Sequence, residues 1–216
     1  MNRLDAKLEK HILFLLKRYP QLEECKKDII KGYLLLEKCY KDGGKLLVAG
    51  NGGSAADSEH IVGELMKRFK KPRHVETAYS EKLKLIDPER GKKLSENLER
   101  SLTAISLVTH EALTTAYIND VDGSGVFAQL LYGFGRMGDV FLGISTSGNS
   151  ENIINATVVA RASGIKIVGL TGANGGELAN VADVVIRVPE IETYMIQELH
   201  LPIYHCWCLM LEDKFY

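Results

Sequence analysis

Five short apolar runs, separated by segments with helical spacing, constrain the fold of this chain more than any other feature. The runs are KLLVAG (45–50), SLTAISL (101–107), DVFLGI (139–144), IKIVGL (165–170) and DVVIRV (183–188). The segments near 55–69, 109–118, 125–135 and 150–163 are expected to be helices, and a short helix is expected after the fourth run. Buried strands that alternate with helices are typical of a parallel sheet covered on both faces. The sequence therefore predicts a five-stranded α/β fold.

The segments that flank these strands are also predicted to be helical. Residues 1–42 contain two helical patterns, the second over roughly 22–41 and closed by Gly43 and Gly44. Because they precede every strand, these helices must pack on the later sheet or on another subunit. A last helix is expected from about 193 to 215, and Pro202 is expected to kink or interrupt it.

One segment, 70–100, interrupts the alternation of strands and helices. It is highly charged and has the pattern of short helices around 79–86 and 89–99. It is interpreted either as a solvated surface excursion or as a lid or subunit contact near the site. The whole chain, 1–216, is treated as a single domain that carries this charged insertion.

Composition excludes several classes of protein. A net charge of −1 in 216 residues gives no case for a general nucleic-acid-binding surface. No apolar run approaches the roughly 18 residues of a membrane span, and the N-terminus lacks a signal-peptide cleavage pattern, so the cytoplasm is the expected location. The four cysteines do not resemble a disulfide framework and are predicted to be buried thiols rather than metal ligands: Cys25, Cys39, Cys206 and Cys208.

The loops that follow the strands carry residues suited to a phosphate group. The first loop, Asn51-Gly52-Gly53-Ser54, allows a tight turn before a helix N-terminus, which favours an anion. The third strand is followed by STSGNS (145–150), which has four hydroxyls in six positions and precedes another helix. Neither a P-loop nor a dinucleotide fingerprint is present. Helix capping needs one such residue rather than four, so the pattern favours a phosphate monoester on a small molecule. The glycine-rich turn at 170–178 is interpreted as structural first.

Two pairs of side chains could supply metal ligands or acid–base groups. His60 and Glu64 are four residues apart and therefore lie on one helix face, where they form half of a possible divalent-metal site. Gln197 and His205 are about 80° apart around an ideal helix, and His200 competes with His205. Taken alone, any one helix histidine is more often a packed or surface residue.

These residues resemble a known family. The chain is similar to the sugar isomerase (SIS) domain, and within it to the sedoheptulose-7-phosphate isomerases, also called phosphoheptose isomerases. The resemblance covers about residues 1–70 and 101–215. It is carried by AGNGGS (49–54), SEHIVGEL (58–65), AISL (104–107), AYIND (116–120), GDVFLGISTSGNSENII (138–154), GLTGANGGELANVADVVIRVP (169–189) and IQELHLPIYH (196–205).

The resemblance implies a doubly wound, flavodoxin-like three-layer sandwich and a homotetramer with active sites between subunits, in which residues 1–42 take part in oligomer packing. It implies that the sugar phosphate is held by Ser54, Ser145, Thr146, Ser147 and Ser150. Asn51 and Asp120 would line the sugar, together with Gly52, Gly53 and Gln197. One zinc ion would be bound by His60, Glu64, Gln197 and His205.

The implied reaction is an aldose–ketose isomerisation of sedoheptulose 7-phosphate to D-glycero-D-manno-heptose 7-phosphate. Glu64 is expected to be the base and His205 the acid, and a metal would stabilise the enediolate. Three features depart from the family pattern. Tyr194-Met195 stand where the family usually carries Asp-Arg, the charged segment at about 72–100 is longer, and Pro202 lies between the two expected ligands.

Other functions remain open from the sequence alone. The main alternative is a non-catalytic adaptor of the kind that binds the bacterial replication initiator, although such an adaptor needs neither Glu64 nor His205. The others are an isomerase for a different phosphosugar, a SIS-type sugar-phosphate deaminase, and a sensor that binds a sugar phosphate without turnover.

Overall fold

The centre of the molecule is a five-stranded sheet in which all neighbouring strands are parallel. The computed structural model describes residues 4–216. Its strands are β1 (Leu46–Gly50), β2 (Ala104–Ser106), β3 (Val140–Ile144), β4 (Lys166–Thr171) and β5 (Val184–Arg187). They lie in the order β2-β1-β3-β4-β5. The order reverses between β1 and β3, so the predicted doubly wound sheet is confirmed, and the loops after these two strands meet at the switch point.

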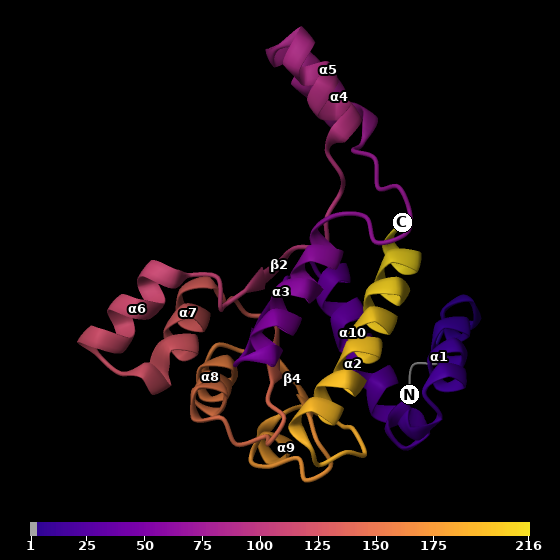
Figure 1. Cartoon of the computed structure of the whole chain (residues 1–216). Coiled ribbons are helices and arrows are strands. Elements are labelled where there is room, and N and C mark those ends of the chain that lie inside the picture. The colour runs from indigo at the N-terminus through magenta and orange to yellow at the C-terminus, as the bar shows by residue number, and fades with distance from the viewer. Residues whose placement is uncertain (1–3) are drawn as a thin grey trace.

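Alternating side chains of the strands form two separate cores, one on each face of the sheet. Leu46 and Val48 point into the first core, and Leu47 and Ala49 point into the second. Helices cover both faces, which gives three layers (Figure 1). The first core is built with α1 (Ala6–Arg18), α2 (Lys26–Lys41), α3 (Gly53–Met66) and α10 (Thr193–Phe215). The second is built with α7 (Val126–Phe134), α8 (Glu151–Ala162) and α9 (Leu178–Val181).

The N-terminal helices are part of the body of the molecule. A short 3-10 helix, η1 (Pro20–Cys25), joins α1 to α2. The indole nitrogen of Trp207 on α10 donates to the carbonyl oxygen of Ile29 on α2 at 2.9 Å. At Gly32 an added Cβ would lie 2.8 Å from the Trp207 ring, so only glycine admits this packing. Residues 1–3 of the expected helical segment lie outside the described residues, and its expected part in oligomer packing stays a prediction.

The charged insertion forms a helical hairpin, called the arm below, that projects from the body (Figure 1). It consists of α4 (Thr77–Ile86) and α5 (Pro88–Asn97), which pack on each other and not extensively on any other described element. His74 and Glu99 form an isolated antiparallel bridge at its base. The two helices predicted there, around 79–86 and 89–99, are confirmed.

The remaining helices lie beside the second core. They are α6 (Glu111–Asp120) and the 3-10 helix η2 (Gly123–Gly125), which connect β2 to α7. Within residues 4–216, no helix is both long enough and apolar enough to cross a membrane. All four cysteines are buried and free, as expected. Burial raises the pKa of Cys206 to about 12, so this side chain stays a thiol.

Two sequence-based boundaries were wrong. The helix expected over 55–69 runs from Gly53 to Met66, because the carboxylate of Glu212 accepts the backbone N–H groups that follow. The second strand is only Ala104–Ser106. The last helix has its predicted bounds, Thr193–Phe215, and continues through Pro202. The burial of this segment in the first core outweighs the backbone hydrogen bond that proline removes.

Candidate active site

The carboxyl ends of β1, β3 and β4 bring three polar loops side by side. Gly50 pairs with Ile144, and Ile144 pairs with Leu170, so the loops that follow these strands start at one edge of the sheet. In open α/β sheets this edge, at the switch point, is where ligands bind. The three loops are Asn51–Gly52, Ser145–Ser150 and Gly172–Glu177.

The Ser145–Ser150 loop is held in a tight conformation before α8. The hydroxyl oxygens of Ser145 and Ser150 are 2.9 Å apart, and the backbone N–H of Asn149 donates to Ser147 Oγ at 3.1 Å. Gly148 has φ +69°, and its carbonyl oxygen accepts from the backbone N–H of Leu178. Thr146, Ser147 and Asn149 line a hollow of about 220 Å³.

The alternative of simple helix capping is not what this loop does. Ser150 is the N-cap residue of α8, yet its side chain makes no capping hydrogen bond with the helix. Its hydroxyl is instead directed to Ser145. The first N–H groups of α8 therefore have no side-chain acceptor from their N-cap, and such groups favour an anion.

The first loop is tied to the first turn of α8 through a pair of amides. Asn51 Nδ2 donates to Asn152 Oδ1 at 2.9 Å, and Asn152 Nδ2 donates back to Asn51 Oδ1 at 3.0 Å. Gly52 has φ +56°, which suits glycine. Ser54 is buried at the start of α3. The structure thus places Asn51 next to α8, at the same edge of the sheet as the hydroxyl-rich loop.

His60, Glu64 and His205 come together on neighbouring faces of α3 and α10. His60 Nε2 is 3.5 Å from Glu64 Oε1 and 3.3 Å from His205 Nε2. Burial, and then the neighbouring His60, hold the pKa of His205 below its usual value, while Glu64 acts in the opposite direction. His205 is therefore a neutral imidazole at neutral pH. These three side chains are called the His/Glu cluster below.

Gln197 lies at the other end of the contact between α3 and α10. An added Cβ on Gly53 would lie 2.6 Å from Gln197 Nε2, so the amide of Gln197 rests against the first turn of α3. Eight helical residues separate Gln197 from His205, a rise of about 12 Å. Within the chain, Gln197 is thus beside the first loop and away from the His/Glu cluster.

The donor set matches a divalent metal in chemical kind but is not assembled for one within a single chain. Imidazole nitrogens and a carboxylate oxygen are ordinary zinc ligands. Across residues 4–216, however, no three His, Cys, Asp or Glu side chains are arranged to hold a metal ion.

Two other candidates lie away from the cluster. His200 is fully buried, and burial lowers its pKa to about 4, so the histidine that competed with His205 is a neutral core residue. Asp120 is exposed at the end of α6 and accepts a hydrogen bond from Asn119 at 2.8 Å. The structure shows no contact between Asp120 and the other expected sugar-lining residues.

Two functional candidates were missed by sequence reasoning. Asp57 and Tyr204 contact each other beside His60: the Tyr204 hydroxyl is 3.0 Å from Asp57 Oδ1 and 3.1 Å from His60 Nδ1. Asp57 precedes His60 by three residues and so shares its helix face, which was an available signal. Tyr204 has no comparable signal, because 147 residues separate it from Asp57.

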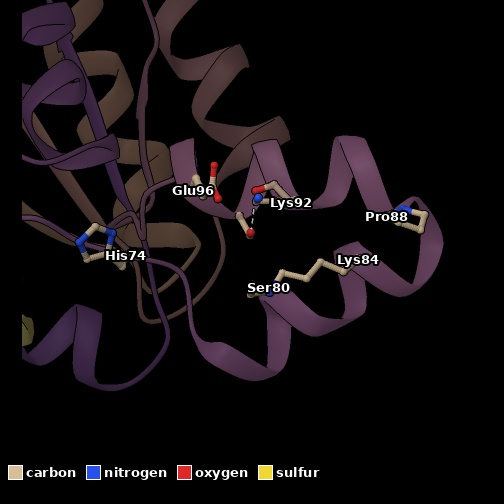
Figure 2. A pocket seen from close by; sticks show the side chains of 7 residues that line it. His74, Ser80, Lys84, Pro88, Lys92 and Glu96 are labelled. Atoms are coloured by element: carbon tan, nitrogen blue, oxygen red, sulfur yellow. Dashed lines mark hydrogen bonds between the residues drawn. The ribbon is translucent and has the colours of Figure 1, made fainter.

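The cluster and the hydroxyl-rich loop open onto different hollows in the single chain. His205 lines a hollow of about 180 Å³ between α1 and α10, together with Phe14 and Leu15. A larger hollow of about 620 Å³ lies between α4 and α5 in the arm (Figure 2). Its lining includes Lys84 and Lys92 and none of the candidate site residues, so it is not the site indicated by the sheet.

Comparisons with known proteins agree with this fold. A family model described as SIS domain matches residues 15–172. A phosphoheptose isomerase from Aneurinibacillus thermoaerophilus is 40% identical over 177 residues, which are 82% of this chain and 76% of that protein. One from Nitratiruptor sp. is 35% identical over 96% of this chain and 98% of that protein. The solved structure of a phosphoheptose isomerase from Francisella tularensis has a TM-score of 0.73 and 29% identity, covering 97% of this chain and 100% of that one.

The five-stranded sheet with its hydroxyl-rich loop at the switch point is thus that of a SIS-domain protein. Within that class the chain belongs to the phosphoheptose isomerase family, whose members are sugar-phosphate isomerases.

Proposed function

We propose that this protein is an aldose–ketose isomerase whose substrate is sedoheptulose 7-phosphate and whose product is D-glycero-D-manno-heptose 7-phosphate. The observation that carries the proposal is the convergence of Glu64, His60 and His205 from two helices that both begin near the hydroxyl-rich loop. A catalyst of this reaction needs a base, an acid and a phosphate anchor. An adaptor or a sensor would need no base.

The phosphate group is anchored by the loop from Ser145 to Ser150. Its hydroxyls and the first N–H groups of α8 supply hydrogen-bond donors, and the positive end of the helix dipole favours the dianion. Ser54, at the start of α3, adds a hydroxyl from the first loop, where the glycines at 52 and 53 let the sugar approach the backbone. Asn51, Gln197 and Asp120 are proposed to contact the sugar hydroxyls.

Glu64 removes the proton from C1 of the ketose, next to the carbonyl carbon, and returns it to C2. The electron pair of the broken C–H bond moves into the enediol, and the carbonyl oxygen takes up a proton from His205. His205 recovers its proton when the C1 hydroxyl becomes the aldehyde. A neutral imidazole is a suitable acid for an enediolate oxygen, and the lowered pKa of His205 keeps it neutral.

We further propose that zinc is held by His60, Glu64, Gln197 and His205 when copies of the chain assemble. Three of these four side chains already lie together, which supports the ligand set. A divalent ion there would supply polarisation of the carbonyl group and stabilisation of negative charge.

The assembly is proposed to be a homotetramer. Leu13 and Phe14 on α1 are 56% and 58% exposed, and Phe14 lines the same hollow as His205. A partner subunit that covers these side chains would also enclose the His/Glu cluster.

The test is to incubate the purified chain with C5 to C7 ketose and aldose phosphates, with and without a chelator, and to follow interconversion by NMR. We expect turnover of the seven-carbon pair and its loss on chelation. Glu64→Gln should lower kcat by about 10²–10⁴-fold. Glu59→Gln, an exposed glutamate on the same helix, serves as the matched control.

The outcomes separate the alternatives. Turnover of a different sugar phosphate would mean another isomerase, and release of ammonia from an amino sugar phosphate would mean a deaminase. Binding without any product would favour the sensor or the adaptor. Full activity of Glu64→Gln would place the base elsewhere.

A further inference from the structure

The hydroxyl group of Tyr204 bridges two side chains of α3. It is 3.0 Å from Asp57 Oδ1 and 3.1 Å from His60 Nδ1. Tyr204 is 1% exposed, whereas His60 lies at the surface. The other carboxylate oxygen of Asp57, Oδ2, is buried and has no hydrogen-bond partner in the described structure. The only hydrogen-bond partner of the half-buried Asp57 carboxylate there is the phenol.

Counting hydrogens decides the direction of these bonds. A carboxylate only accepts, and a tyrosine hydroxyl carries one hydrogen, so Tyr204 donates to Asp57. The Tyr204 oxygen can then only accept a hydrogen bond from His60. His60 must therefore carry a hydrogen on Nδ1 and donate it to Tyr204. A neutral imidazole has one hydrogen, which leaves Nε2 of His60 with a free lone pair.

We propose that Tyr204 and Asp57 are positioning residues that hold His60 in its Nδ1–H tautomer and turn the Nε2 lone pair toward Glu64 and His205. They act through His60, in the way that carboxylate partners fix the ring and tautomer of functional histidines in other proteins.

This arrangement has a direct consequence for the His/Glu cluster. His60 Nε2 can accept a hydrogen from His205 Nε2 across 3.3 Å, and it cannot donate one to Glu64 Oε1 at 3.5 Å. The Glu64 oxygen therefore stays free to take a proton, while the hydrogen on His205 Nε2 is held in place. The effect on turnover rests on the proposed function, but the tautomer is a property of the folded chain alone.

The experiment measures the imidazole ¹⁵N shifts of His60 by long-range ¹H–¹⁵N NMR on the metal-free full chain at alkaline pH. The wild-type ring should be the Nδ1–H tautomer. Tyr204→Phe removes the hydroxyl and keeps the aromatic ring. In Asp57→Asn, the new amide NH₂ group can donate to the Tyr204 oxygen, and the Tyr204 hydroxyl then donates to His60 Nδ1. Both variants should shift His60 toward the Nε2–H tautomer. Tyr33→Phe is the matched control, because Tyr33 is an equally buried tyrosine on α2.

The second readout is steady-state kinetics. Tyr204→Phe and Asp57→Asn should lower kcat by about 10–100-fold while KM changes little, because the phosphate anchor is untouched. An Nε2–H tautomer in the wild type, or an unchanged tautomer in Tyr204→Phe, would overturn the proposal. Unchanged kcat in both variants would overturn its link to turnover. If the wild-type chain isomerises no sugar phosphate, the proposed function fails, and the NMR result still decides the positioning role.

Discussion

A buried ion pair, Arg73–Glu212, fixes the turn that leaves α3. Arg73 Nε donates to Glu212 Oε1 at 2.9 Å, and both side chains are almost fully buried. Arg73 also donates to the backbone oxygens of Leu65 and Glu64. Glu212 accepts the N–H groups of the turn at residues 69–71. The last turn of α3, which carries Glu64, is thereby anchored to α10.

Removal of this carboxylate is expected to be costly. Glu212→Gln leaves Arg73 charged and buried without its partner, which should lower the free energy of unfolding by about 3–5 kcal/mol. Glu81→Gln, which breaks an exposed pair with Lys84, should cost under about 1 kcal/mol. Urea denaturation of the two variants measures the difference. Equal stability of both would show that the buried pair contributes little.

The Glu212 carboxylate also makes the free energy of unfolding depend on pH. Burial alone would raise the pKa of Glu212, but the N–H groups of Phe69 and Lys70 and the guanidinium of Arg73 lower it below the ordinary value. Stabilisation from a depressed pKa is complete above the unfolded value of about 4.3 and is lost as pH falls through the folded value. Wild-type stability should therefore fall below that pH, and the fall should be smaller in Glu212→Gln.

At the scale of residues, sequence patterns predicted contacts between side chains that are close along the chain. They missed the contacts of Arg73 with Glu212 and of Asp57 with Tyr204, which are distant along the chain. The spacing of His60 and Glu64 was sufficient to place them on one helix face. Arg73 and Glu212 are separated by 139 residues, and Asp57 and Tyr204 by 147. No local pattern indicates such contacts, because they depend on how α3 and α10 pack. The ligand set expected from family resemblance remains a prediction.

At the scale of elements, the hydroxyl-rich loop depends on a glycine. Gly148 has φ +69°, and an added Cβ would overlap the carbonyl oxygen of Gly175 in the neighbouring loop. The two loops after β3 and β4 are therefore packed backbone against backbone. Any side chain at position 148 would force them apart.

Gly148→Ala should weaken both the fold and the binding of sugar phosphate. The left-handed conformation alone costs an L residue about 1–2 kcal/mol, and the overlap adds to it. Gly63→Ala is the contrasting control: Gly63 lies inside α3 with nothing near its Cβ position, so alanine should stabilise the chain by about 0.5–1 kcal/mol. Thermal unfolding and phosphate-dependent shifts in Tm measure both. Normal Tm and affinity in Gly148→Ala would mean that the two loops are not held in contact.

Helices and strands were predictable where the residues of the segment itself determine the structure. The apolar runs predicted all five strands because parallel strands buried on both faces are apolar throughout. The end of α3 was not predictable, since a carboxylate from α10 satisfies the N–H groups there. The sequence did not decide whether the last helix continues through Pro202, because it does not show that this helix is packed in a core.

At the scale of the whole molecule, the arm is structurally separate from the body. The chain leaves the body at Arg73 and returns at Arg100, whose backbone N–H donates to the Arg73 carbonyl oxygen at 2.6 Å. Leu85 and Ile86 near the tip are each 84% exposed. The charge pattern predicted the insertion and its two helices, but helical spacing carries no information on whether a hairpin folds back or projects.

Replacement of residues 76–97 by a short glycine-containing turn should leave the body folded. Since α4 and α5 contribute no buried large apolar side chain to either core, the Tm should change by only a few degrees. Circular dichroism and light scattering measure the fold and the assembly. Unfolding of the shortened chain would mean that the arm supports the body, and a smaller assembly would identify the arm as a subunit contact.

The narrow base of the arm also makes it a suitable site for the insertion of another folded domain. Where a chain exits and re-enters across one bridge, as it does between His74 and Glu99, the ends of an inserted folded module meet at nearly the same place. A fluorescent reporter grafted there would extend from the body of the molecule, away from the sheet and both cores.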